Sequence, residues 1–158
     1  MNRLWIGLAV LSAAGIVLFG LLLHRRFDAL REWKKDYQPP QLRFRYTADE
    51  ISAEFAQMGQ REKRLLRQFN LLMAPMLFYV GMALAVVTRN AALYPWMAWA
   101  MAALAGAAVL SGLLESMLLI AQNLAAKAAR ACSLLKWICF GIWVAGMFIG
   151  LFIRSTAL

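Results

Sequence analysis

The chain has 158 residues, of which 63% are hydrophobic, and its formal net charge is +9 at pH 7. The length leaves room for a single domain, 1–158, and the apolar share lies far above the roughly 45–50% of a soluble domain, which excludes an ordinary water-soluble fold. The charge alone would suit a nucleic-acid binder, but the basic residues cluster between apolar runs, where membrane topology requires them. We therefore expect an integral membrane protein whose surroundings are the lipid bilayer, and no nucleic-acid partner.

Four apolar stretches are long enough to cross a bilayer, whose hydrocarbon core takes about 20 apolar residues of helix. They cover about residues 4–23, 71–88, 94–114 and 137–153. A spanning segment must satisfy its backbone hydrogen bonds internally, so each stretch is expected to be a helix. The sequence predicts an all-α fold, a polytopic transmembrane four-helix bundle, in which the first span is retained as an anchor rather than cleaved as a signal peptide.

Lysine and arginine are unevenly distributed around these spans. Fourteen of the 17 basic residues lie in loop 24–70 or between the third and fourth spans. Arg3, Arg89 and Arg154 fall on the other side. The positive-inside rule then predicts a multi-pass protein of the inner (plasma) membrane, with loop 24–70 in the cytoplasm and both termini outside it.

The first half of the loop has apolar residues at helical spacing, with basic residues on the opposite face. This pattern predicts that the first span continues as a helix lying along the lipid headgroups, with Trp33 and Tyr37 at the interface. Pro39 and Pro40 are expected to end that helix, because proline donates no backbone hydrogen bond.

A second helical region is predicted after the prolines. Thr47 and Glu50 have the spacing of a capping box at a helix start, and Gly59 suits a stop or kink. The basic stretch 60–70 then leads into the second span. Its charges either only set the topology or also bind lipid headgroups or a partner; the residues concerned are Arg61, Lys63, Arg64 and Arg67.

Glu115 is the one acidic residue outside the first loop. It lies about 30 Å along the helix from Pro95, near the cytoplasmic end of the third span. One interpretation is an ion pair with Lys127, Arg130, Lys136 or a basic residue of loop 24–70. The other is an ion or proton site with Ser111 and Ser116, since a carboxylate within the membrane is a functional candidate.

Residues that usually carry catalysis or bind metals are scarce. The chain has one histidine and two cysteines, Cys132 and Cys139, and these do not make a zinc or haem ligand set. We expect no enzymatic activity, no catalytic residues, no metal and no cofactor.

From Tyr46 onward, over about two thirds of the chain, the sequence resembles an uncharacterised group of small bacterial membrane proteins with about four transmembrane helices. The resemblance rests on residues 46–50 (YTADE), Gly59 with Arg61 and Arg64, 75–79 (PMLFY), 113–116 (LLES) and 134–137 (LLKW). Members of that group carry an acidic residue in the second span and another before the Leu-Leu-Glu segment. This chain has Asn70, Ala74 and Ser111 in those neighbourhoods, so the resemblance implies the fold without a shared intramembrane acidic cluster or an established activity.

Two functional hypotheses follow. The leading one is a non-enzymatic subunit, anchor or accessory protein that binds a protein partner or anionic lipid through its basic loop. The alternative is a small transporter or channel, formed as a homo-oligomer, that uses Glu115.

Overall fold

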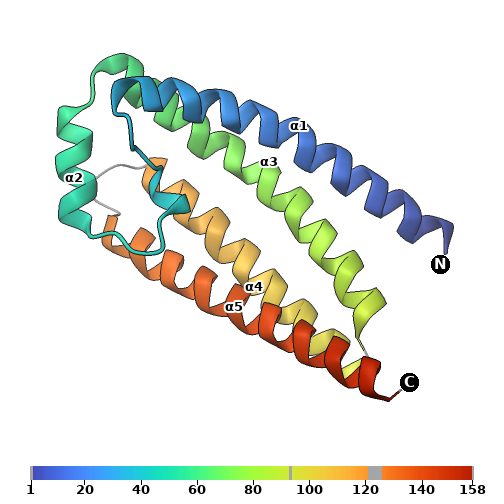
Figure 1. Cartoon of the computed structure of the whole chain (residues 1–158). Coiled ribbons are helices and arrows are strands. Elements are labelled where there is room, and N and C mark those ends of the chain that lie inside the picture. The colour runs from blue at the N-terminus through green and yellow to red at the C-terminus, as the bar shows by residue number, and fades with distance from the viewer. Residues whose placement is uncertain (1, 93, 121–125, 158) are drawn as a thin grey trace.

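The computed structural model describes residues 2–92, 94–120 and 126–157 (Figure 1). These residues form five α-helices and one short 3₁₀ helix, without any strand. In chain order the elements are α1 (Arg3–Trp33), η1 (Pro40–Leu42), α2 (Ala48–Gln57), α3 (Gln60–Ala91), α4 (Pro95–Ile120) and α5 (Ala126–Thr156). The predicted all-α class, a four-helix bundle with a helical loop, is confirmed.

Four of the helices, α1, α3, α4 and α5, are long and apolar enough to cross a membrane. Each contains one predicted span, but α1, α3 and α5 extend well beyond the apolar run into charged sequence. A helix satisfies its own backbone hydrogen bonds and can continue into water, whereas a span counted from apolar residues stops at the first charge. Large apolar side chains such as Trp99 and Phe148, 80% and 70% exposed, cover the outer faces, as expected of helices solvated by lipid.

The long helices are arranged side by side in the order α1, α3, α4, α5. α3 packs against α1 on one side and α4 on the other, and α5 packs along α4. Figure 1 shows both chain termini at one end of the bundle, with η1, α2 and the beginnings of α3 and α5 at the opposite end. The residues of loop 24–70 and the first turns of α5 therefore gather at the same end, which we call the basic end.

Near the termini, α3, α4 and α5 are held together by close packing and one buried hydrogen bond. A Cβ placed on Gly146 of α5 would lie 2.7 Å from Met101 Sδ of α4, so the missing side chain makes room for the methionine. Trp143 of α5, 8% exposed, donates from Nε1 to Thr88 Oγ1 of α3 at 3.0 Å. Small residues and polar side chains commonly join membrane helices in these two ways.

The first span continues as a helix into the loop, as predicted, but this helix ends at Trp33 rather than at Pro39 and Pro40. α1 runs without interruption to that point and stays beside α3 (Figure 1). Tyr37 follows the helix end and is only 2% exposed, packed with Leu30 and Met58 in an apolar cluster that Trp33 borders. Tyr37 is therefore not available to headgroups. Helical spacing identified the apolar face correctly but could not tell that protein, rather than lipid, covers it.

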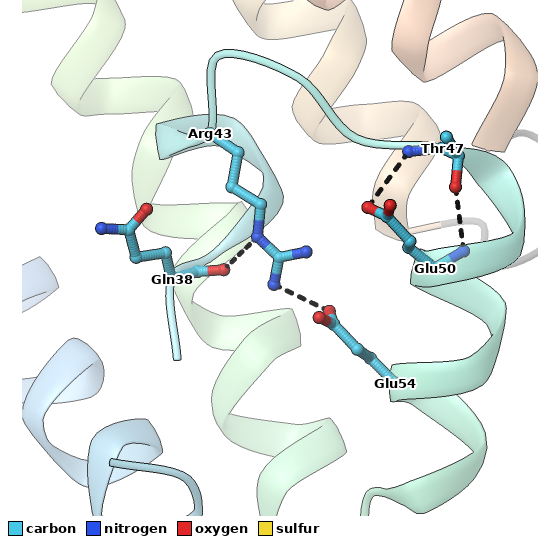
Figure 2. A network of polar contacts seen from close by, with 5 residues as sticks. All are labelled: Gln38, Arg43, Thr47, Glu50 and Glu54. Atoms are coloured by element: carbon cyan, nitrogen blue, oxygen red, sulfur yellow. Dashed lines mark hydrogen bonds and ion pairs between the residues drawn. The ribbon is translucent and has the colours of Figure 1, made fainter. Parts of the chain in front are cut away.

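The start of α2 was predicted correctly from its capping box. The Glu50 backbone N–H donates to Thr47 Oγ1 at 3.2 Å, and the Thr47 N–H is 3.5 Å from Glu50 Oε2 (Figure 2). Arg43 ties the segment before this helix to it, because its guanidinium donates to the Gln38 carbonyl and to Glu54 of α2, both at 2.8 Å. Residues 38–47 are thereby held as an ordered turn across the basic end.

The boundary between α2 and α3 lies at Met58 and Gly59. Met58 is the last, extended residue after α2 and contributes its side chain to the apolar cluster with Tyr37. Gly59 caps the start of α3, so the glycine marks the predicted break. α3 then runs as one helix from the basic stretch into the second span, as expected.

Candidate functional site

Glu115 on α4 is completely buried, with a relative exposure of 0%. Its carboxylate oxygen Oε2 lies 2.6 Å from Lys136 Nζ of α5, whose side chain is 15% exposed. Lys136 is one of the partners that the sequence suggested. A carboxylate removed from water is costly unless it is paired and hydrogen-bonded, and the ammonium group meets that requirement.

The second carboxylate oxygen of Glu115 is bonded to the loop. Tyr46 donates its phenolic hydrogen to Glu115 Oε1 at 2.9 Å, and Lys136 Nζ also donates to the Gln41 carbonyl at 3.0 Å. Burial, and secondly the negative charge of Glu115, raise the pKa of the Tyr46 phenol well above its usual value. The phenol therefore stays protonated at any physiological pH and remains a donor.

A further contact connects this site to α3. The side chains of Gln41, in η1, and Asn70, in α3, are hydrogen-bonded to each other, and both are almost completely buried. η1, α3, α4, α5 and the Tyr46 segment thus meet in one polar cluster around Glu115. We call this group, made of Gln41, Tyr46, Asn70, Glu115 and Lys136, the buried polar cluster.

Ser111 and Ser116, predicted with Glu115, lie on the same buried side of α4, at 4% and 1% exposure. Ser116 Oγ has no hydrogen-bond partner within the part of the chain that the structure describes. The recorded bonds to the Glu115 carboxylate come from Tyr46 and Lys136. The three predicted residues are therefore close in space, but the partners of the carboxylate come from other elements.

Sequence reasoning missed three members of the buried polar cluster: Gln41, Tyr46 and Asn70. Tyr46 and Asn70 are 69 and 45 positions from Glu115 in the chain, and no spacing rule connects residues so far apart. The resemblance drew attention to Asn70 only as a place where an acidic residue was missing. Its amide fits its position, because it can bond to the neutral Gln41 side chain without adding a buried charge.

The predicted basic residues of α3 divide into two groups. Lys63, Arg64 and Arg67 line a groove of about 250 Å³ at the basic end, completed by Phe55, Leu66, Asn70, Leu119 and Ile120. Arg61 lies outside this groove and pairs with Glu32 of α1 at 3.6 Å, both side chains being about 70% exposed. An exposed pair of this kind adds little stability.

The groove has a mixed chemical character. Lys63 Nζ lies 4.7 Å from the centre of the Phe55 ring, a cation–π distance. Arg64 and Arg67 have no ion-pair partner among the described residues. Such a groove offers positive charge and apolar surface together, which suits an anionic headgroup or an acidic, partly apolar protein segment. We call it the basic groove.

Within the described ranges, no three His, Cys, Asp or Glu side chains lie close enough together to hold a metal ion. Comparison of the chain with protein-family models, with curated proteins and with solved structures gives no match.

Proposed function

We propose that this chain is a non-enzymatic protein of the bacterial inner membrane, a subunit, anchor or accessory component that binds an anionic partner through the basic groove. The proposal rests on which charged side chains have a partner within the chain. Glu115 and Lys136 form an ion pair with each other inside the molecule. Arg64 and Arg67, in contrast, have no carboxylate partner among the described residues.

The buried polar cluster supports a structural use of Glu115. Both of its carboxylate oxygens are bonded, one to an ammonium group and one to a phenol. These bonds join α4 and α5 to the loop and hold the segment before α2 in place. For the alternative function, a small transporter, the carboxylate would have to release both donors to take up an ion or proton.

The basic groove supports binding at the cytoplasmic side. Its three cations lie at the end of the molecule where most lysines and arginines gather, and the positive-inside rule assigns that end to the cytoplasm. The inner leaflet is negatively charged, and each Lys or Arg near it contributes about 1 kcal/mol of attraction. A protein partner with an acidic, partly apolar surface would use the same groups.

The test is recovery of a partner from mild detergent with the wild-type chain and with the triple variant Lys63→Gln, Arg64→Gln, Arg67→Gln. We expect the wild type to recover a reproducible protein or anionic lipid, identified by mass spectrometry, and the triple variant to lose it. Three charges at about 1 kcal/mol each predict a loss of about 100-fold in affinity.

A matched control removes three exposed charges outside the groove: Arg25→Gln, Lys34→Gln and Lys35→Gln. It should recover the partner as the wild type does. Both variants keep eight of the eleven basic residues of loop 24–70, so the topological signal is retained. Repeated recovery of the bare protein alone, or a flux in proteoliposomes that Glu115→Gln abolishes, would overturn the proposal.

A further inference from the structure

A second pocket lies at the basic end, between the segment 44–46 and the first part of α5. Its volume is about 310 Å³, and it is lined by Phe44, Arg45, Tyr46, Arg130, Ser133 and Leu134. It is separate from the basic groove, since the two share no lining residue.

The polar side of this pocket has the chemistry of an anion site. Arg45 and Arg130 are exposed, and neither has an ion-pair partner in the part of the chain that the structure describes. Two guanidinium groups that line one pocket supply the positive charge and the N–H donors that a phosphate group binds.

Ser133 lies on the inner wall of the pocket and is only 2% exposed. It faces the Tyr46 phenol and lowers the pKa of that group. The anion-binding groups that a ligand can reach are therefore the two exposed arginines.

An apolar groove continues directly from the pocket along α5. It has a volume of about 370 Å³ and shares Phe44 and Leu134 with the pocket; the other lining residues are Trp137, Ile138, Gly141 and Ile142. From Leu134 to Ile142 the groove runs about 12 Å along the helix axis, into the predicted fourth span. At Gly141 a Cβ would have no atom within 4 Å, so the groove is open there.

We propose that the pocket and the groove together bind one anionic phospholipid. Its phosphate lies between Arg45 and Arg130, and one acyl chain lies along Gly141. The proposal deepens the proposed function, on which it rests for the membrane location and for the cytoplasmic placement of the basic end. A free phosphate would satisfy the arginines but would leave the apolar groove unused, and the groove favours lipid as the source of the phosphate.

Tyr46 connects the lipid pocket to the buried polar cluster. Tyr46 lines the pocket, while its hydroxyl is bonded to Glu115. A lipid bound there holds the segment 44–46 against α5 and so supports the buried polar cluster.

The test uses the full chain in mild detergent and measures binding of phosphatidylglycerol and of phosphatidylcholine by native mass spectrometry. We expect selective binding of phosphatidylglycerol by the wild type. The double variant Arg45→Gln, Arg130→Gln should bind it about 10- to 30-fold more weakly, the effect of two arginines at a headgroup. The double variant Arg25→Gln, Lys34→Gln loses the same charge from exposed positions outside the pocket and the basic groove and should keep this binding.

A second variant, Gly141→Leu, tests the acyl-chain groove without changing any charge. Because a Cβ at this position would meet no atom within 4 Å, the variant should fold as the wild type does and lose phosphatidylglycerol. Unchanged binding in Gly141→Leu, together with displacement by inorganic phosphate, would identify a free-phosphate site and overturn the lipid proposal.

The two proposals fail in different ways. Unchanged lipid binding in Arg45→Gln, Arg130→Gln, with loss of the partner in the triple variant of the basic groove, would overturn the lipid site alone. Unchanged partner recovery in the triple variant, together with unchanged phosphatidylglycerol binding in Arg45→Gln, Arg130→Gln, would overturn both.

Discussion

Replacing Lys136 with methionine is expected to lower the free energy of unfolding by about 3–5 kcal/mol, the usual cost of removing one member of a buried ion pair. Glu115 has no exposed surface, and the structure gives it one ammonium partner, at 2.6 Å. Without that partner the carboxylate is left charged in a medium of low polarity, or it must take up a proton. The measurement is reversible unfolding in detergent micelles or bicelles.

The double variant Glu115→Leu, Lys136→Met distinguishes a buried pair from two independent residues. Removing both charges leaves two apolar side chains in their place, and such a replacement often leaves the free energy of unfolding nearly equal to that of the ion pair. The double variant should therefore regain most of the stability that Lys136→Met loses. Lys127→Met, at an exposed position of α5, is the matched control and should change the stability by less than about 0.5 kcal/mol. Strictly additive effects of the two single changes would show that the residues do not interact.

Gly15→Leu is expected to destabilise the chain by about 1–3 kcal/mol or more, the cost of forcing extra atoms into a packed contact. A Cβ at Gly15 of α1 would lie 2.4 Å from the ring of Tyr79 of α3. That ring also stacks on Phe19 of α1, with 5.7 Å between the ring centres. Since α1 packs chiefly on α3, this contact is the main one that holds α1 in the bundle.

The measurement for Gly15→Leu is thermal stability in detergent, combined with the protease sensitivity of loop 24–70. Gly7→Leu is the control, because it places the same side chain on the same helix at an exposed position where a Cβ meets no atom within 4 Å. It should behave as the wild type does. Equal effects of the two substitutions would mean that helix propensity, not the close approach of α1 to α3, determines the result.

The elements that could be predicted from the sequence are those determined by residues close to one another in the chain. A run of about 20 apolar residues can satisfy its backbone in lipid only as a helix, and each predicted span lies inside one long helix. The Thr47–Glu50 capping box needs only residues three positions apart, and it is formed as expected.

The elements that could not be predicted depend on which parts of the chain cover one another. Tyr37 has the apolar spacing of an interfacial residue, but the turn after α1 brings it against Met58 and the chain itself covers it. Glu115 was placed near the cytoplasmic end of its helix from its distance to Pro95. Its complete burial depends on the loop segment with Gln41 and Tyr46 folding over the helix ends, and neither residue has a local signal for that role.

We propose that lipid surrounds four helices of this chain and that its basic end lies in the cytoplasm. Reporter fusions after Gly59, after Arg89 and at the C-terminus test this topology, with a reporter active only in the cytoplasm and another active only outside it. We expect a cytoplasmic signal after Gly59 and an outside signal at the other two positions. A signal from the same side of the membrane after Gly59 and after Arg89 would contradict it.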